Sequence, residues 1–141
     1  MKHWVYTIGQ RDQAPPLDWM GKWGHHVHEM WFSRTKTGLG TVHRGDLALI
    51  YGSKGTGFLA AVRVTDDAPT PNPHPTGSVR YPWRMAHDLL VAKAADGFKA
   101  VPEDAGISTQ RIMRGPYSGI EPEEFARGLD LLLLRARESA W

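Results

Sequence analysis

Tryptophan residues beside basic residues are the feature of this sequence that points most directly to chemistry. The chain has 141 residues, and six of its 14 aromatic residues are tryptophan. Trp23 follows Lys22 in a connecting segment, and Trp83 follows a proline-rich stretch at 66–79. An indole held on a loop can stack on a nucleic-acid base, a contact worth roughly 1–3 kcal/mol. The sequence therefore predicts stacking surfaces at Trp23 and Trp83.

Two other motifs suggest chemistry that their context does not favour. The run GSKGTG at 52–57 lacks the Gly-x-x-x-x-Gly-Lys-Ser/Thr spacing of a phosphate loop and joins two expected strands, so we read it as a hairpin connection. The run HHVHE at 25–29 offers imidazoles, which ligate zinc when neutral, but no third or fourth ligand follows at a usual spacing. We expect solvated histidines there, with no metal and no cofactor.

Catalysis finds little support in the residue types present. The absence of cysteine excludes disulfides, thiolate metal sites and a cysteine nucleophile. The serines lack the context of a nucleophile elbow, and no carboxylate pair stands out. Asp46 follows the turn residue Gly45, which is typical of a structural role. We expect a binding protein; a nuclease or other hydrolase remains the alternative, and a module binding a metabolite or a protein is a third.

Charge is distributed unevenly along the chain. Residues 1–64 carry eight bases and four acids, whereas residues 121–141 carry three bases and five acids. A basic first half beside aromatic residues is compatible with a polyanionic partner. No apolar run approaches the ~20 residues of a membrane span, and the N-terminal residues lack the apolar core of a signal peptide. The sequence predicts a cytoplasmic protein without a membrane partner.

Short strands dominate the expected secondary structure. The aromatic and β-branched run His3–Ile8 predicts a strand, and residues 47–51 and 58–64 predict a hairpin. A further strand is expected at 84–91. Alternating prolines predict an exposed, extended loop at 66–78. Trp4 and Trp31 are both expected in the core.

The C-terminal part predicts a helix. Pro122 and the acidic residues beside it are typical of a helix start. One apolar face would carry Phe125, Leu129, Leu132 and Leu133. The alternative is that the helix stops near Gly128 and residues 131–134 form a last strand. Together these elements predict a single α+β domain over residues 1–141, with a small curved sheet or open barrel and helices at its margin.

Five segments, in order, resemble the EVE domain family of the PUA-like superfamily, which is related to the YTH domains. They are HWVYTI at His3–Ile8, KWG at 22–24, HRGDLALIYGSKGTGFLAAVRV at 43–64, RYPWRM at 80–85 and IMRGPYSGIEPEEFARGL at 112–129. The resemblance covers about 120 residues. Two features depart from it: Gly24 replaces a side chain able to hydrogen-bond in the YTH relatives, and Trp83 stands where tyrosine is commoner. The stretch 66–79 has no counterpart, and it is a candidate cover for the pocket.

The resemblance implies a PUA-like curved sheet or open β-barrel flanked by short helices. It also implies a reader of nucleic acid, DNA or RNA, whose modified base is flipped into an aromatic pocket, at an extrusion cost of a few kcal/mol. The pocket residues it implies are Thr7, Ile8, Gly9, Trp23, Gly24, Tyr51, Gly52, Ser53, Trp83 and Arg114. From charge and proximity, the expected phosphate contacts are Lys22, Lys54, Arg80 and Arg84.

Overall fold

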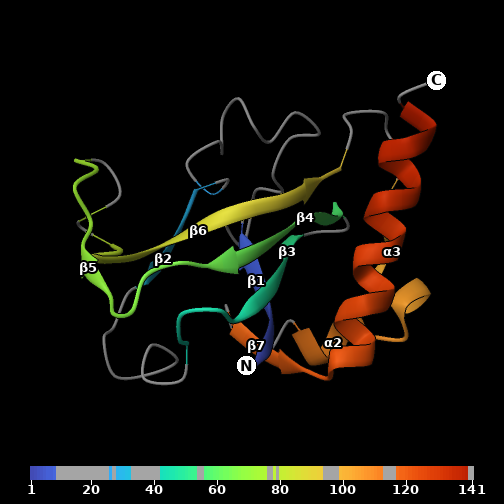
Figure 1. Ribbon diagram of the computed structural model, residues 1–141, viewed down its shortest axis with the longest axis horizontal. Coiled ribbons are helices and arrows are strands. Elements are labelled where there is room, and N and C mark those ends of the chain that lie inside the picture. Colours follow the sequence, from blue (N-terminus) through green and yellow to red (C-terminus); the bar gives the residue numbers. More distant parts are fainter. Residues whose placement is uncertain are drawn as a thin grey trace.

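The chain folds into one strongly curled mixed sheet with helices packed beside it (Figure 1). This computed structural model describes residues 1–8, 26, 28–32, 42–53, 56–75, 78, 80–93, 99–112 and 117–139, with side chains up to residue 134. The expected α+β fold with a curved sheet is confirmed. The strands are β1 (His3–Ile8), β2 (Glu29–Phe32), β3 (Leu47–Gly52), β4 (Gly57–Val64), β5 (Thr70–Pro71), β6 (Trp83–Ala92) and β7 (Tyr117–Ile120). The helices are η3 (Pro102–Ala105), α2 (Thr109–Ile112) and α3 (Pro122–Ser139).

The strand order is β2-β6-β4-β3-β1-β7, and β5 is added beside β6. The first strand, β1, runs parallel to β3 and antiparallel to β7. The predicted hairpin is confirmed as β3 and β4, and the predicted strand at 84–91 is confirmed within β6. Since parallel strands need a long crossover, the whole stretch between β1 and β3 serves as that connection.

Alternation along the strands divides the buried residues into two cores. Tyr6 and Ile8 of β1 join an inner core that the sheet curls around, together with Phe32 and Met85. Val5 lies on the other face, in a helix-side core that α3 closes with Phe125 and Leu132. Successive side chains of a strand point to opposite faces, so β1 contributes to both cores.

Asp46 fixes the start of β1 against the start of β3. Its carboxylate accepts hydrogen bonds from the backbone nitrogens of Lys2 and His43, both at 2.9 Å, and from Nε1 of Trp4 at 3.2 Å. Although burial alone would raise the pKa of Asp46, these hydrogen bonds hold it below the ordinary value. The structural role predicted for Asp46 is confirmed, and Trp4 is half-buried against the inner core.

The last helix, α3, continues through Gly128 to Ser139, so the alternative of a final strand at 131–134 is wrong. Gly128 is a packing position: a Cβ there would lie 2.4 Å from Cδ1 of Leu49, which is fully buried. Leu133 does not share the buried face and is 41% exposed.

Within the described residues, no helix is both long enough and apolar enough to span a membrane.

The proline-rich segment is bound to the sheet more firmly than the sequence predicts. Thr70 and Pro71 pair with the beginning of β6, and Asn72 is 7% exposed. The Asn72 backbone nitrogen donates to the carbonyl of Pro82 at 2.9 Å, and its Nδ2 donates to the carbonyl of Tyr81 at 2.8 Å. Thr70 and Pro71 are exposed and extended as expected, but they form a short strand rather than a loop, and the expected exposure is wrong for Asn72. The strand edge of β6 supplies partners that lie beyond the local sequence of this segment.

Tyrosine hydroxyls join the two ends of the strand order. The backbone nitrogen of Trp31 in β2 donates to Oη of Tyr6 at 3.1 Å, and the carbonyl of Trp31 accepts from Oη of Tyr117 at 2.6 Å. The Tyr6 and Tyr117 rings stack 5.4 Å apart, and Phe32 stacks on Tyr117 at 4.7 Å. Burial raises the pKa of both tyrosines, which keeps the hydroxyls protonated. Side chains thus join β2 to β1 and β7, between which no strand ladder runs in the described part of the chain.

We expect Tyr117→Phe to lower the free energy of unfolding by about 1–2 kcal/mol, because the carbonyl of Trp31 loses its donor. Urea denaturation would measure this change. Tyr81→Phe serves as the control, since Tyr81 is only half-buried and the loss of its hydroxyl is expected to matter by less than about 0.5 kcal/mol. Equal midpoints for the two variants would contradict closure through Tyr117.

Candidate nucleic-acid interface

Four of the predicted pocket residues meet at the carboxyl ends of β1 and β3. Ile8 is paired with Gly52, and the preceding Thr7 is paired with Tyr51. The backbone nitrogen of Ser53 donates to the carbonyl of Ile8 at 3.0 Å, which extends the parallel pairing by one residue. Parallel pairing therefore brings Thr7, Ile8, Gly52 and Ser53 together although the paired residues Ile8 and Gly52 are 44 positions apart in the sequence.

Two hydroxyls at this edge lack hydrogen-bond partners. Oγ1 of Thr7 and Oγ of Ser53 are both buried, and neither contacts a donor or acceptor. A buried polar group left unpaired costs about 1–3 kcal/mol, and such groups are rare in native proteins. A ligand could supply the missing partners once neighbouring groups move aside, because both oxygens are closed to solvent.

Tyr51 and Gly52 support this edge rather than line it. Tyr51 is 3% exposed and packs in the helix-side core, with its ring edge-on to Phe58 at 6.0 Å. The space beside Gly52 is filled by Thr56, because a Cβ on Gly52 would lie 2.8 Å from Cβ of Thr56. The hydroxyl of Thr56 in turn donates to the carbonyl of Ser53 at 3.0 Å and fixes the turn.

The remaining predicted residues of known position gather at the beginning of β6. Trp83 is half-buried, pairs with Phe32 and packs on the inner core. Thr7 shares the opposite, helix-side face with Val5, so the structure does not bring Trp83 and Thr7 into one pocket wall. Arg80 is exposed, and its guanidinium lies 5.5 Å above the ring of Tyr81.

Arg84 differs from the expected phosphate contact. Its Nη1 donates to Oε2 of Glu29 at 3.1 Å, while its Nε is buried without a partner. Glu29 is 6% exposed, so the positive charge of Arg84 balances a buried negative charge. Arg84 therefore belongs to the framework of the sheet.

Six predicted residues lie outside the part of the chain that the structure describes. They are Gly9, Lys22, Trp23, Gly24, Lys54 and Arg114. Described residues flank two of these positions. His26, two residues after Gly24, contacts Tyr6 through a 3.4 Å distance between its Nδ1 and the tyrosine hydroxyl, and its ring lies 5.5 Å from that of Trp31.

An ion pair joins Arg111, which precedes Arg114 in the sequence, to Glu124, which follows it. Arg111 of α2 forms a two-pronged contact with Glu124 of α3, with Nη1–Oε2 at 2.6 Å and Nη2–Oε1 at 2.9 Å. Nη2 of Arg111 also donates to the carbonyl of Gly119 in β7 at 3.1 Å. Although burial would raise the pKa of Glu124, its contact with Arg111 keeps that pKa low. α2, β7 and α3 are thereby fixed to one another on both sides of Arg114.

Sequence reasoning missed a second polar cluster, centred on Glu29. Its Oε1 accepts from Nε1 of Trp31 at 2.8 Å and pairs with Nε2 of His74 at 2.5 Å. Trp31 is half-buried on the face away from the inner core, so its predicted place in the core is wrong. The spacing of two between Glu29 and Trp31 was a usable signal, because residues i and i+2 of a strand share a face.

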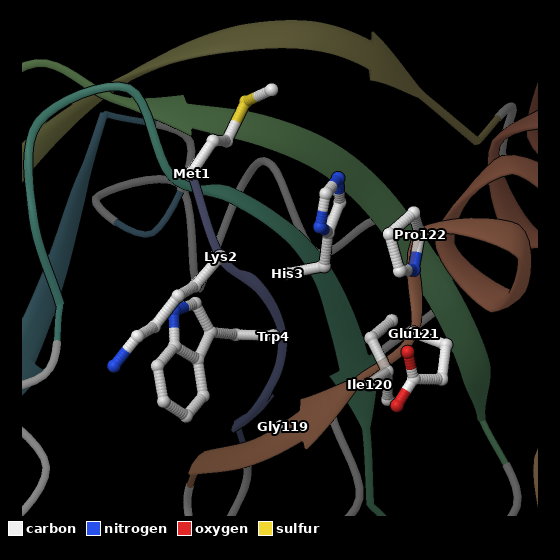
Figure 2. A pocket seen from close by; sticks show the side chains of 8 residues that line it. All are labelled: Met1, Lys2, His3, Trp4, Gly119, Ile120, Glu121 and Pro122. Atoms are coloured by element: carbon white, nitrogen blue, oxygen red, sulfur yellow. The ribbon is translucent and has the colours of Figure 1, made fainter.

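A shallow depression lies at the other end of β1 from Thr7, where the strand begins (Figure 2). It encloses about 320 Å³ and lies between the beginning of β1 and the residues that lead from β7 into α3. The amine of Lys2 lies 5.9 Å from the ring centroid of Trp4, and the two side chains run side by side in Figure 2. This depression contains none of the predicted pocket residues.

The histidine motif at 25–29 forms no metal centre in the described residues. No group of three or more histidine, aspartate or glutamate side chains there is arranged to hold an ion. His28 is exposed, but the expectation of solvated histidines is wrong for His26, which is buried beside Tyr6.

Comparison with known proteins establishes the fold alone. No protein-family model and no curated protein matches this chain. Among solved structures, Rpa0253 from Rhodopseudomonas palustris is similar with a TM-score of 0.57 and 12% identity, over 95% of this chain and 94% of that one. A hypothetical protein from Leishmania major is similar with a TM-score of 0.54 and 13% identity, over 99% and 97% of the two chains. Atu2648 from Agrobacterium tumefaciens gives 0.55 and 12%, over 95% and 92%.

Proposed function

We propose that this protein is a reader of modified bases in DNA or RNA, built on an EVE-type domain. The modified base is flipped out of its strand and held at the carboxyl ends of β1 and β3. The observation that carries the proposal is the pair of buried, unpartnered hydroxyls of Thr7 and Ser53 at this edge. It supports the proposal because the sequence resemblance assigns the base to the same residues.

The chemistry of the site suits a flipped base. Each base edge offers donors and acceptors, and a hydroxyl can serve as either. Extruding the base costs a few kcal/mol, which stacking and edge hydrogen bonds offset. In this proposal Thr7 and Ser53 read the edge, while Trp23 supplies the stacking face. Because a methyl group adds little apolar contact by itself, discrimination depends on the shape of the pocket.

The proposal is tested by replacing the Thr7 hydroxyl with a methyl group in Thr7→Val. In titrations of DNA and RNA oligonucleotides with and without base modifications, we expect the wild type to prefer one modified base. Thr7→Val is expected to weaken binding of that oligonucleotide by about 5- to 30-fold, the worth of one lost hydrogen bond. The same variant is expected to unfold at a slightly higher urea concentration, because it removes an unpaired buried hydroxyl.

Thr65→Val provides the control, at a half-buried threonine just beyond β4. It is expected to bind like the wild type. Modified and unmodified oligonucleotides that bind the wild type equally would refute the proposal, as would an unchanged affinity in both Thr7→Val and Trp23→Ala. Cleavage of the oligonucleotides by purified protein would place the protein among the enzymes.

A further inference from the structure

Aromatic and cationic side chains form a continuous surface around Trp31. The ring centroid of Trp31 lies 5.2 Å from that of His74 and 6.2 Å from that of Tyr81. The guanidinium of Arg80 lies over the ring of Tyr81, 5.5 Å from its centroid. Trp31, His74 and Tyr81 are half-buried and Arg80 is exposed. We call these four residues the Trp31 surface.

The proline-rich segment holds this surface in place. The side-chain oxygen of Asn72 accepts from the backbone nitrogen of His74 at 3.1 Å, and Nδ2 of Asn72 donates to the carbonyl of Tyr81. Asn72 therefore connects the two segments that carry His74 and Tyr81. A surface fixed before binding loses little conformational freedom when a ligand arrives.

The charges of the Trp31 surface favour an anion. Glu29 lies beneath it, but its side chain is 8% exposed and is paired with His74 and Arg84. The exposed charge is therefore that of Arg80, whose planar guanidinium stacks on an aromatic ring and keeps its edges available to phosphate oxygens. Aromatic faces combined with such a cation are the means by which proteins hold single-stranded nucleic acid.

The backbone of Trp31 is joined to β1 through the residue that precedes Thr7. Tyr6, whose hydroxyl accepts from the backbone nitrogen of Trp31, directly precedes Thr7 in β1. Tyr117, the partner of Tyr6 across β1 and β7, donates to the carbonyl of Trp31. A strand with one base held beside Thr7 would thus have its neighbouring nucleotides close to Trp31.

We infer that the Trp31 surface binds the unpaired nucleotides that flank the recognised base, which rests on the proposed function. Tyr81 stacks on a flanking base, and Arg80 contacts a phosphate. These contacts read neither sequence nor modification, so they contribute equally to every oligonucleotide. The segment around Asn72 has a function in this arrangement, because it fixes His74 and Tyr81.

The inference is tested with unmodified oligodeoxythymidine and oligouridine, by fluorescence anisotropy at several salt concentrations. Tyr81→Ala is expected to weaken binding about tenfold, whereas Tyr81→Phe keeps the ring and binds normally. Arg80→Gln is expected to reduce the slope of log affinity against log salt by about 0.7, the value for one phosphate contact to a single strand. Arg63→Gln, at an exposed arginine of β4, is the matched control and leaves the slope unchanged.

The outcomes separate this inference from the proposed function. If Tyr81→Ala and Arg80→Gln bind like Arg63→Gln, the inference is wrong, whatever base the protein prefers. If both variants weaken modified and unmodified strands by the same factor, the inference holds even where the wild type shows no preference among bases. A loss confined to the modified strand would place these residues in base recognition and overturn the inference, as would a wild type that binds neither oligonucleotide at low salt.

Discussion

We expect the free energy of unfolding to fall by about 3 kcal/mol between pH 6.5 and pH 4 because of His87 alone. His87 is 3% exposed, and neither of its ring nitrogens has a hydrogen-bond partner. Burial lowers its pKa from 6.5 to about 4. Between these values the unfolded chain binds a proton that the folded protein does not bind. The protonation of His87 therefore does not reduce stability above pH 6.5. It reduces stability as the pH is lowered from 6.5 to 4 and causes no further reduction below pH 4.

Urea denaturation at a series of pH values checks this expectation. In His87→Leu the slope of stability between pH 6.5 and pH 4 should become flatter by the contribution of His87. The variant should also be at least as stable as the wild type at neutral pH, because two unpaired nitrogens are removed. His43→Gln, at an exposed histidine, should keep the slope of the wild type. A slope that persists in His87→Leu would show that other groups cause it.

Gly57→Ala is expected to lower the free energy of unfolding by roughly 3 kcal/mol or more. Gly57 has a φ of +90°, a region that costs other residues about 1–2 kcal/mol. A Cβ there would also lie 2.8 Å from the carbonyl oxygen of Ala100, which accepts a 2.8 Å hydrogen bond from the backbone nitrogen of Phe58. Relief of the clash requires breaking that hydrogen bond or moving the segment before η3, and either adds to the conformational cost.

Gly45→Ala separates the two costs. Gly45 has nearly the same φ, +89°, but no atom lies within 4 Å of the Cβ it would gain. It should lose only the conformational part, about 1–2 kcal/mol. Chemical denaturation of both variants gives the contribution of the close contact as the difference between them. Equal losses would mean that the backbone at Ala100 yields without cost. A shift of the backbone at Gly57 in the alanine variant is also expected to disturb Ser53, since Gly57 pairs with Gly52, the residue before Ser53.

The parts of the fold that follow from local sequence were predictable. The aromatic and β-branched run HWVYTI predicts β1, and the glycine-rich connection between apolar runs predicts the β3–β4 hairpin. The start of α3 was evident from Pro122 and the acidic residues beside it. In each case the signal lies within a few residues of the element that it specifies, which is where propensity and patterning act.

The end of α3 depends on a distant contact and could not be read locally. Glycine inside a helix is unfavourable by about 1 kcal/mol relative to alanine, which makes Gly128 resemble a stop. The side chain of Leu49 occupies the space beside Gly128, so close packing of the helix on β3 takes precedence over propensity. With α3 packed on β3 through Gly128, Leu133 lies outside the buried face of the helix.

The candidate site was predictable only in part, for a similar reason. Thr7 and Ser53 could be placed at strand ends from the sequence, but the parallel pairing of β1 with β3 decides that they are neighbours. Trp31 looked like a core residue because it lies in the apolar run Met30-Trp31-Phe32. Its true environment depends on His74, which comes from a segment more than 40 residues away. Pairing between distant segments is not encoded in any local pattern.

β1 gains its second neighbouring strand only late in the sequence, when β7 has been made. β3 covers one edge of β1 early, but the other edge waits for β7, which begins at residue 117. An open strand edge rich in aromatic and β-branched residues is a template for pairing with other chains. During synthesis, nascent chains on neighbouring ribosomes would present this edge to one another until β7 has been made. Transient protection of the β1 edge by a chaperone is therefore expected to raise the yield of this protein.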